Sequence, residues 1–276
     1  MAAEDAPLFE LRDLRLSLPD MTAKPLFGAA PQIEILKGLS FDIERGSVIG
    51  IVGGSGSGKS TLGRTLLRLL EPTGGTIRFD GSDITHLPES ALRKVRHRVQ
   101  MIFQDPMSSL NPRRRVGGII AGPLRLHGFD AIAARVDTAL DRVGLPRSFR
   151  QRYPHELSGG QRQRVGIARA IALEPEFILA DEIVSGLDVS SQAQVLNLLE
   201  HLVAELGLTL AFISHDLSVI RRLCTEVVVM HQGKIVEHAP TARLFEAPTA
   251  EYTRALLDAI PLPDPDQPGW PAATAG

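Results

Sequence analysis

Ser47-Val48-Ile49-Gly50-Ile51-Val52-Gly53-Gly54-Ser55-Gly56-Ser57-Gly58-Lys59-Ser60-Thr61 is the stretch that decides the fold of this chain. Its first part, residues 47–52, is a short apolar run that predicts a buried strand. The second part fits the pattern G-x-x-x-x-G-K-[ST], and the leucines that follow recur at helical spacing. A strand, a glycine-rich loop and a helix in this order aim backbone N–H groups and a positive helix end at phosphate oxygens. The stretch therefore predicts an α/β protein that binds a nucleotide. A purely structural glycine turn is the alternative, which the lysine, the hydroxyl and the helix together disfavour.

Each part of this phosphate loop has an expected role toward ATP and Mg²⁺. Lys59 should reach the β- and γ-phosphates, and the Ser60 hydroxyl should ligate Mg²⁺. The glycines let the main chain approach the phosphates closely and adopt positive φ. The residues expected around the nucleotide are Gly53, Gly54, Ser55, Gly56, Ser57, Gly58, Lys59, Ser60 and Thr61.

Two acids end another apolar run. Residues 177–180 read as a strand, and Asp181 and Glu182 follow it, where open α/β sheets place their ligands. We expect Asp181 to hold Mg²⁺, directly or through water, and Glu182 to polarise the attacking water. Alone, the pair would fit a solvated acidic turn equally well. The phosphate loop in the same chain favours the hydrolytic role.

Two more strands are expected to carry polar groups at their ends. Residues 208–214 deliver His215, which could contact the γ-phosphate or orient the water. Residues 99–103 end at Gln104, which could reach both Mg²⁺ and the water. A lone histidine is more often structural, and a loop glutamine is often satisfied by backbone, so both roles depend on the neighbouring motifs.

A second glycine-rich helix start lies between these strands. In Leu157-Ser158-Gly159-Gly160-Gln161, Ser158 suits an N-cap and Gln161 occupies the third helical position of a capping box. Capping accounts for Ser158 but not for the two glycines, which leave the first N–H groups uncovered. We therefore expect Ser158, Gly159, Gly160 and Gln161 to form a second phosphate-seeking helix end.

Together these residues resemble the ATP-binding subunits of ABC transporters, in the family's order and spacing over roughly residues 8–240. The resemblance implies a P-loop NTPase (RecA-like) core sheet, an N-terminal antiparallel β subdomain and an inserted helical subdomain. It also implies a head-to-tail dimer with ATP sandwiched between subunits. The Ser158 segment of one subunit would cover the γ-phosphate held by the other, and Asp188 would lie at the dimer interface.

Three further segments are similar to the oligopeptide, dipeptide and nickel importer branch: residues 105–112, 188–199 and 252–261. This likeness implies two transmembrane permease subunits, a second ATPase subunit in a heterodimer or a homodimer, and, indirectly, an extracytoplasmic solute-binding protein. In the family the helical subdomain docks the permease, and Met107, Leu110 and the run 113–115 are our candidates for that surface. The chain would act at the cytoplasmic face of the inner membrane, peripherally. Nucleic acid is not an expected partner, and the cargo stays open.

The chain departs from the family pattern at a few positions. Ile183 stands where proline is usual, and Gly186 where alanine or serine is usual, so we expect a less rigid loop after Glu182. Gly54 stands where this branch commonly has glutamate. The adenine base is expected to stack on Phe27, with Ile33 as an aliphatic alternative.

Length and composition agree with this interpretation. The chain has 276 residues, 43% of them hydrophobic, a net charge of −2 and one cysteine, which suits a folded globule in a reducing compartment. No apolar run approaches the ~20 residues that span a bilayer, so a membrane role should run through partners. We expect an ATPase domain at 1–240, with helical stretches around 115–127 and 131–143 in an insertion at about 105–165.

We expect a C-terminal extension at 241–276, with helices at 241–246 and 250–259 after a hairpin at 226–237 and with a poorly ordered tail. A DNA-repair or chromosome ATPase would normally add a long coiled coil or zinc modules, neither of which is predicted here. A non-catalytic regulatory subunit would not need Glu182 and His215. Export instead of import is the remaining alternative within transport.

Overall fold

The computed structural model describes residues 6–20, 28 and 30–259, and its centre is a six-stranded sheet. Five of the strands run parallel, and the last one pairs antiparallel at an edge. The strand order is β10 (Lys234–Pro240), β9 (Glu226–His231), β3 (Val48–Val52), β8 (Thr209–Ile213), β7 (Phe177–Asp181) and β6 (Val99–Ile102). This order brings the carboxyl ends of β3, β8, β7 and β6 to one edge of the sheet, so the polar residues that follow these strands share that edge.

The central strands read as continuous apolar runs because both faces of the sheet are covered. Every residue of β3, β7 and β8 is buried. Neighbouring residues supply opposite cores, as Ile178 and Leu179 of β7 do. This pattern is typical of a parallel sheet between two layers.

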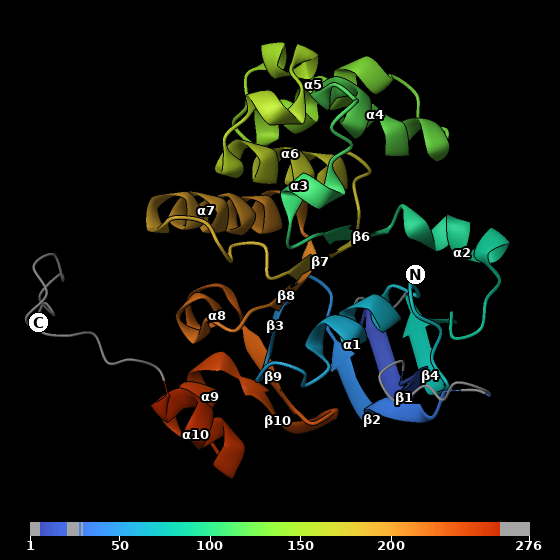
Figure 1. Ribbon diagram of the computed structural model, residues 1–276, viewed down its shortest axis with the longest axis vertical. Coiled ribbons are helices and arrows are strands. Elements are labelled where there is room, and N and C mark those ends of the chain that lie inside the picture. Colours follow the sequence, from blue (N-terminus) through green and yellow to red (C-terminus); the bar gives the residue numbers. More distant parts are fainter. Residues whose placement is uncertain (1–5, 21–27, 29, 260–276) are drawn as a thin grey trace, which may run out of the picture.

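A smaller antiparallel sheet covers one face. Its strand order is β2 (Gln32–Ile43), β1 (Phe9–Pro19), β4 (Gly74–Phe79) and β5 (Ser82–Asp83). It shares a core with α1 (Lys59–Leu66), the helix that follows the phosphate loop. Figure 1 shows β1, β2 and β4 beside α1 in the blue to teal part of the chain.

The helical insertion forms a separate layer. Figure 1 shows α3 (Pro106–Ser109), α4 (Val116–Leu126), α5 (Ile132–Arg142) and α6 (Gly159–Ile171) gathered beyond the β6 edge of the sheet. Short 3-10 turns at Arg147–Gln151 and Pro154–Glu156 link α5 to α6, while α2 (Glu89–Arg96) precedes β6. The helices expected around 115–127 and 131–143 are confirmed.

One expectation for the insertion is wrong. Leu110, which we placed on a docking surface, is only 1% exposed and belongs to the core that the insertion shares with the sheet. A leucine in a short connecting segment gives no sign from sequence of which way it faces. The side chain of Met107 lies outside the described residues.

The remaining helices complete the layers. α7 (Val189–Leu206) and α8 (Leu217–Leu223) pack on the face shared with the insertion. The expected hairpin is β9–β10, and the two helices expected after it are α9 (Thr241–Glu246) and α10 (Glu251–Asp258). Among the described residues, no helix combines the length and the apolar character that crossing a bilayer requires.

Candidate nucleotide-binding and hydrolysis site

The phosphate loop turns between β3 and α1 with three glycines in positive φ. Gly53, Gly56 and Gly58 have φ of 149°, 75° and 102°, which side chains rarely adopt. Gly58 is also the N-cap of α1, so the helix begins without a capping side chain and its first N–H groups face the loop. The hydroxyl of Ser57 is buried and has no hydrogen-bond partner among the described residues. This cradle fits an anion that brings its own acceptor oxygens.

Lys59 is folded back onto the loop that precedes it. Its amine donates to the carbonyl oxygens of Gly53 at 2.8 Å and Gly54 at 2.9 Å. Burial lowers the pKa of Lys59, and the carboxylates of Glu182 and Asp181 oppose that shift. The amine is therefore held beside the loop, close to two acids.

Asp181 and Ser60 lie together at the end of β7 and the start of α1. The Ser60 hydroxyl donates to Asp181 Oδ1 at 2.9 Å, and burial raises the pKa of Asp181. Among the described residues, no three His, Cys, Asp or Glu side chains gather to hold a metal by themselves. A hydroxyl and one carboxylate fit Mg²⁺, which is usually bound through few protein ligands and the phosphates of its nucleotide.

Glu182 is surrounded by the other residues expected to act in hydrolysis. Gln104 Nε2 donates to Glu182 Oε2 at 2.9 Å, and His215 Nδ1 lies 3.7 Å from Glu182 Oε1. Glu182 has φ of 48°, a conformation that a non-glycine residue rarely adopts, and the Ser185 hydroxyl donates to its carbonyl oxygen at 2.7 Å. Three strand ends thus deliver a carboxylate, an amide and an imidazole to one point.

The two unusual residues of the loop after Glu182 have distinct surroundings. Ile183, in the usual proline position, is 1% exposed and packs in the core. Gly186 has φ of 78°, so a glycine suits the turn that alanine or serine would strain.

These groups line one open cavity of about 660 Å³. Its walls are the phosphate loop, Glu182, His215 and Leu256. Gln104 and Asp181 do not line the cavity themselves but hydrogen-bond to Glu182 and Ser60, which do. The cavity can accept a phosphorylated ligand with a positive helix end on one side and a carboxylate on the other.

The Ser158 segment lies elsewhere in the same chain. Ser158 accepts from the Gln161 N–H at 3.3 Å and the Gln161 side chain accepts from the Ser158 N–H at 3.0 Å, so the expected capping box is confirmed. Ser158, Gly160 and Gln161 line another hollow, between the helical insertion and α7. Asp188 is exposed and caps α7, accepting from the Ser191 N–H at 2.9 Å. The structure therefore does not bring these residues to the phosphate loop of their own chain.

Two residues were expected to contact the adenine base, Phe27 and Ile33. Phe27 lies outside the described residues, and Ile33 is 45% exposed and does not line the cavity.

Two residues of α10 that sequence reasoning missed do reach the site. Leu256 lines the cavity, and the Tyr252 hydroxyl accepts from the Gly54 N–H at 2.9 Å. Both lie in the segment 252–261 that resembles the importer branch, but nothing in that segment indicates a contact with the loop.

Comparison with known proteins agrees with the geometry. The sequence profile of the family described as ABC transporter matches residues 36–185. The chain belongs to the ABC transporter family. A peptide import ATP-binding protein of Brucella ovis is 51% identical over 265 residues, which is 95% of this chain and 81% of that protein. The oligopeptide transport ATP-binding protein AppF of Bacillus subtilis is 49% identical over 266 residues, or 95% of this chain and 80% of that one.

A solved structure shows the same fold. The ATP-binding cassette MJ0796, a dimer in a post-hydrolysis state with ADP and Pi, superimposes with a TM-score of 0.73 and 28% identity. The match covers 84% of this chain and 98% of that chain. The chain is thus an ATP-binding cassette ATPase with the expected P-loop NTPase fold.

Proposed function

We propose that this chain is the ATP-hydrolysing subunit of an importer for oligopeptides or dipeptides, acting at the cytoplasmic face of the inner membrane. The observation that carries hydrolysis is the position of Glu182, between Gln104 and His215 at the open edge of the phosphate cavity. The importer role is supported by relatives with about half of their residues identical over 95% of this chain. The same ATPase role for nickel or another small solute is the alternative.

Each residue of the site has a part in hydrolysis. Glu182 polarises the attacking water, and Gln104 and His215 orient the water and the carboxylate. The N–H groups of the phosphate loop and the amine of Lys59 stabilise the charge that develops on the γ-phosphate. Ser60, Asp181 and Gln104 would hold Mg²⁺, which neutralises charge on the β- and γ-phosphates when bound.

The second phosphate-seeking helix end acts in a dimer. Because the Ser158 segment lies away from the phosphate loop of its own chain, it would cover the nucleotide of a second subunit. Asp188 caps the helix beside this segment and would lie at the same interface. The second subunit is a different ATPase in the assembly that we favour, and ATP binding closes the pair.

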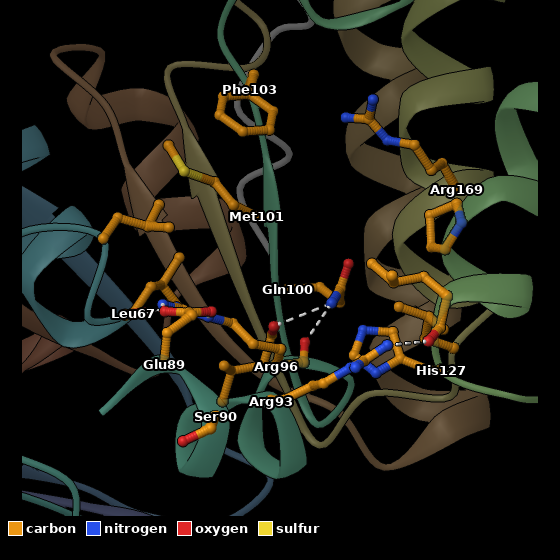
Figure 2. Close-up of a pocket in the computed structure, with 15 residues that line it drawn as sticks. Leu67, Glu89, Ser90, Arg93, Arg96, Gln100, Met101, Phe103, His127 and Arg169 are labelled. Carbon is orange, nitrogen blue, oxygen red and sulfur yellow. Dashed lines mark hydrogen bonds and ion pairs between the residues drawn. The ribbon is translucent and has the colours of Figure 1, made fainter. Parts of the chain in front are cut away.

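A groove between the sheet and the helical insertion is the proposed docking site for the permease. It has a volume of about 680 Å³, and Figure 2 shows Phe103 and Met101 on one side facing Arg169 and His127 on the other. Phe103 is 42% exposed and Leu126 61% exposed, so apolar surface is open to a partner. Arginines from α2 and α6 line the same groove, which suits a short amphipathic permease helix with acidic residues.

The groove also adjoins the hydrolysis site through the chain itself. Phe103 precedes Gln104, whose amide holds Glu182. A permease helix that presses on Phe103 would therefore act on the residue that positions the catalytic carboxylate. This adjacency gives a short physical route from the membrane subunits to the ATPase site.

The experiment is a pull-down of this chain from detergent-solubilised membranes in Mg-ATP, with Glu182→Gln to hold the closed dimer. We expect two multi-span permeases and a second ATPase, and the solute-binding protein linked to them would identify the cargo. Phe103→Arg should lose the permeases, whereas Ala204→Arg, at an exposed position of α7 outside the groove, should retain them. Recovery of soluble partners, DNA or ribosomes alone would overturn the transport role and leave the ATPase site standing.

A further inference from the structure

The C-terminal helix α10 reaches the phosphate loop across 198 residues of sequence. The Tyr252 hydroxyl accepts a hydrogen bond from the Gly54 N–H at 2.9 Å. The tyrosine ring packs on His231, with ring centroids 3.9 Å apart and planes at 31°. The hydroxyl is thus held against the loop by a ring that itself packs on a second ring.

The start of α10 is anchored on the sheet by a buried carboxylate. Glu237 of β10 is 8% exposed and accepts from the Thr249 N–H at 2.9 Å, the Thr249 hydroxyl at 2.9 Å and the Ala250 N–H at 3.0 Å. Burial would raise the pKa of Glu237, but the Thr253 side chain and the hydrogen bonds from Thr249 and Ala250 prevail, and the pKa is lowered to about 2. The carboxylate therefore supplies the cap that Ala250, the N-cap residue of α10, lacks.

The C-terminal hairpin holds the same loop at a second point. The Gly233 N–H, in the turn between β9 and β10, donates to the Ser57 carbonyl at 3.1 Å. The Gly233 carbonyl in turn accepts from the Lys37 N–H at 2.9 Å, which ties the turn to β2. The phosphate loop is thus hydrogen-bonded to α10 at Gly54 and to the hairpin at Ser57.

Gly54 connects α10 to the phosphate-binding lysine. Its N–H is held by Tyr252, and its carbonyl oxygen accepts from the Lys59 amine at 2.9 Å. A Cβ atom at this position would lie 3.0 Å from the Tyr252 hydroxyl, closer than side chains normally pack. The glycine in place of the branch's usual glutamate therefore leaves room for the tyrosine.

We propose that Tyr252 is a positioning residue of the ATP site, which holds Gly54 so that the phosphate loop and Lys59 keep the shape that receives phosphates. The inference rests on the proposed assignment of residues 53–61 to the nucleotide. Tyr252 acts through the loop and does not touch the reacting atoms, so its loss weakens nucleotide affinity and leaves the chemical step unchanged. The C-terminal extension is thereby part of the nucleotide site in this chain.

The test is Tyr252→Phe, which removes the hydroxyl and keeps the ring on His231. MgADP binding is measured by calorimetry, because ADP occupies the loop without turnover. We expect the dissociation constant to rise by about 2- to 10-fold, as the loss of one hydrogen bond implies. The KM for ATP should rise similarly with kcat within about twofold, a split that a general loss of folded protein would not produce. Tyr153→Phe removes a hydroxyl on the helical insertion and should change neither constant.

A second variant makes the contact itself testable. Gly54→Ala places a Cβ against the Tyr252 hydroxyl and should weaken MgADP binding in the native background. In the Tyr252→Phe background the same change should add little, because the atom it crowds is gone. Unchanged affinity in Tyr252→Phe, or fully additive effects, would overturn the positioning role. If the native chain fails to bind MgADP, or Lys59→Ala binds it equally well, the assignment of the loop fails instead.

Discussion

Replacing Glu237 by glutamine should release α10 from the sheet without unfolding the rest of the chain. One carboxylate oxygen accepts from Thr249 and the other from the Ala250 N–H. The glutamine amide can serve Thr249 but turns an N–H₂ group toward Ala250, which replaces a charge-assisted bond by a contact between donors. Such a bond contributes about 1.5–3 kcal/mol, so we expect α10 to lose about 2 kcal/mol of local stability. That loss corresponds to about 30-fold faster exchange of its amide protons when opening and closing are fast compared with the exchange itself.

Hydrogen–deuterium exchange of the peptide around 249–258 measures this directly, and its pH dependence has a defined sign. The pKa of Glu237 falls from 4.5 to about 2 on folding, so its contribution is complete above about pH 4.5. It is lost as the pH falls from about 4.5 toward 2. The difference between native chain and Glu237→Gln should therefore be full at pH 7 and shrink as the pH drops below about 4.5, after correction for intrinsic exchange rates.

The matched control is Glu226→Gln on the same hairpin. Glu226 pairs with His238 at 2.9 Å, and the imidazole is partly exposed, so the pair should contribute at most about 1 kcal/mol. Its ion pair is with His238, whereas Thr249 and Ala250 at the start of α10 hydrogen-bond to Glu237. Equal exchange in α10 for Glu237→Gln and the native chain at pH 7 would refute the capping argument.

Three further outcomes follow from the geometry. Glu182→Gln should slow phosphate release at least about 100-fold while MgADP still binds, and turnover near the native rate would remove Glu182 from its proposed role. Gly63→Ala should lower the free energy of unfolding in urea by about 1–3 kcal/mol, because the new Cβ would lie 2.6 Å from a Leu179 methyl group. An unchanged urea midpoint would show that the surrounding core adjusts without loss of stability. Arg98→Ala should cost about 1 kcal/mol, because Arg98 donates to Glu176 at 2.9 Å, and the cost should shrink in 1 M salt; a salt-independent loss would point to packing instead.

The sequence predicted those parts of the site that short segments specify. The phosphate loop and the box that caps α6 at Ser158 are local patterns, in which neighbours in the chain are also neighbours in space. The strand ends at Gln104, Glu182 and His215 were also predictable, because each apolar run ends where its polar residue begins. Parallel strands then bring these ends to one edge of the sheet.

The direction in which a side chain faces was less predictable. Leu110 looks like a surface residue in a connecting segment, yet it is buried. Its burial depends on the core that the insertion forms with the sheet, and no periodic pattern in a short segment encodes that packing. For residues 252–261 the sequence showed only a likeness to the importer branch and did not predict that Tyr252 would contact Gly54.

By itself, then, the sequence determined the fold class, and it supplied the predictions for the nucleotide loop and the hydrolytic groups, because each depends on residue types within one element. Only the tertiary structure decided that Glu182 stands between an amide and an imidazole, and that Ser158 lies away from the loop of its own chain. It also decided that Tyr252 holds Gly54. These relations join residues far apart in the sequence, and their distances are set by strand order and by the packing of layers on the sheet.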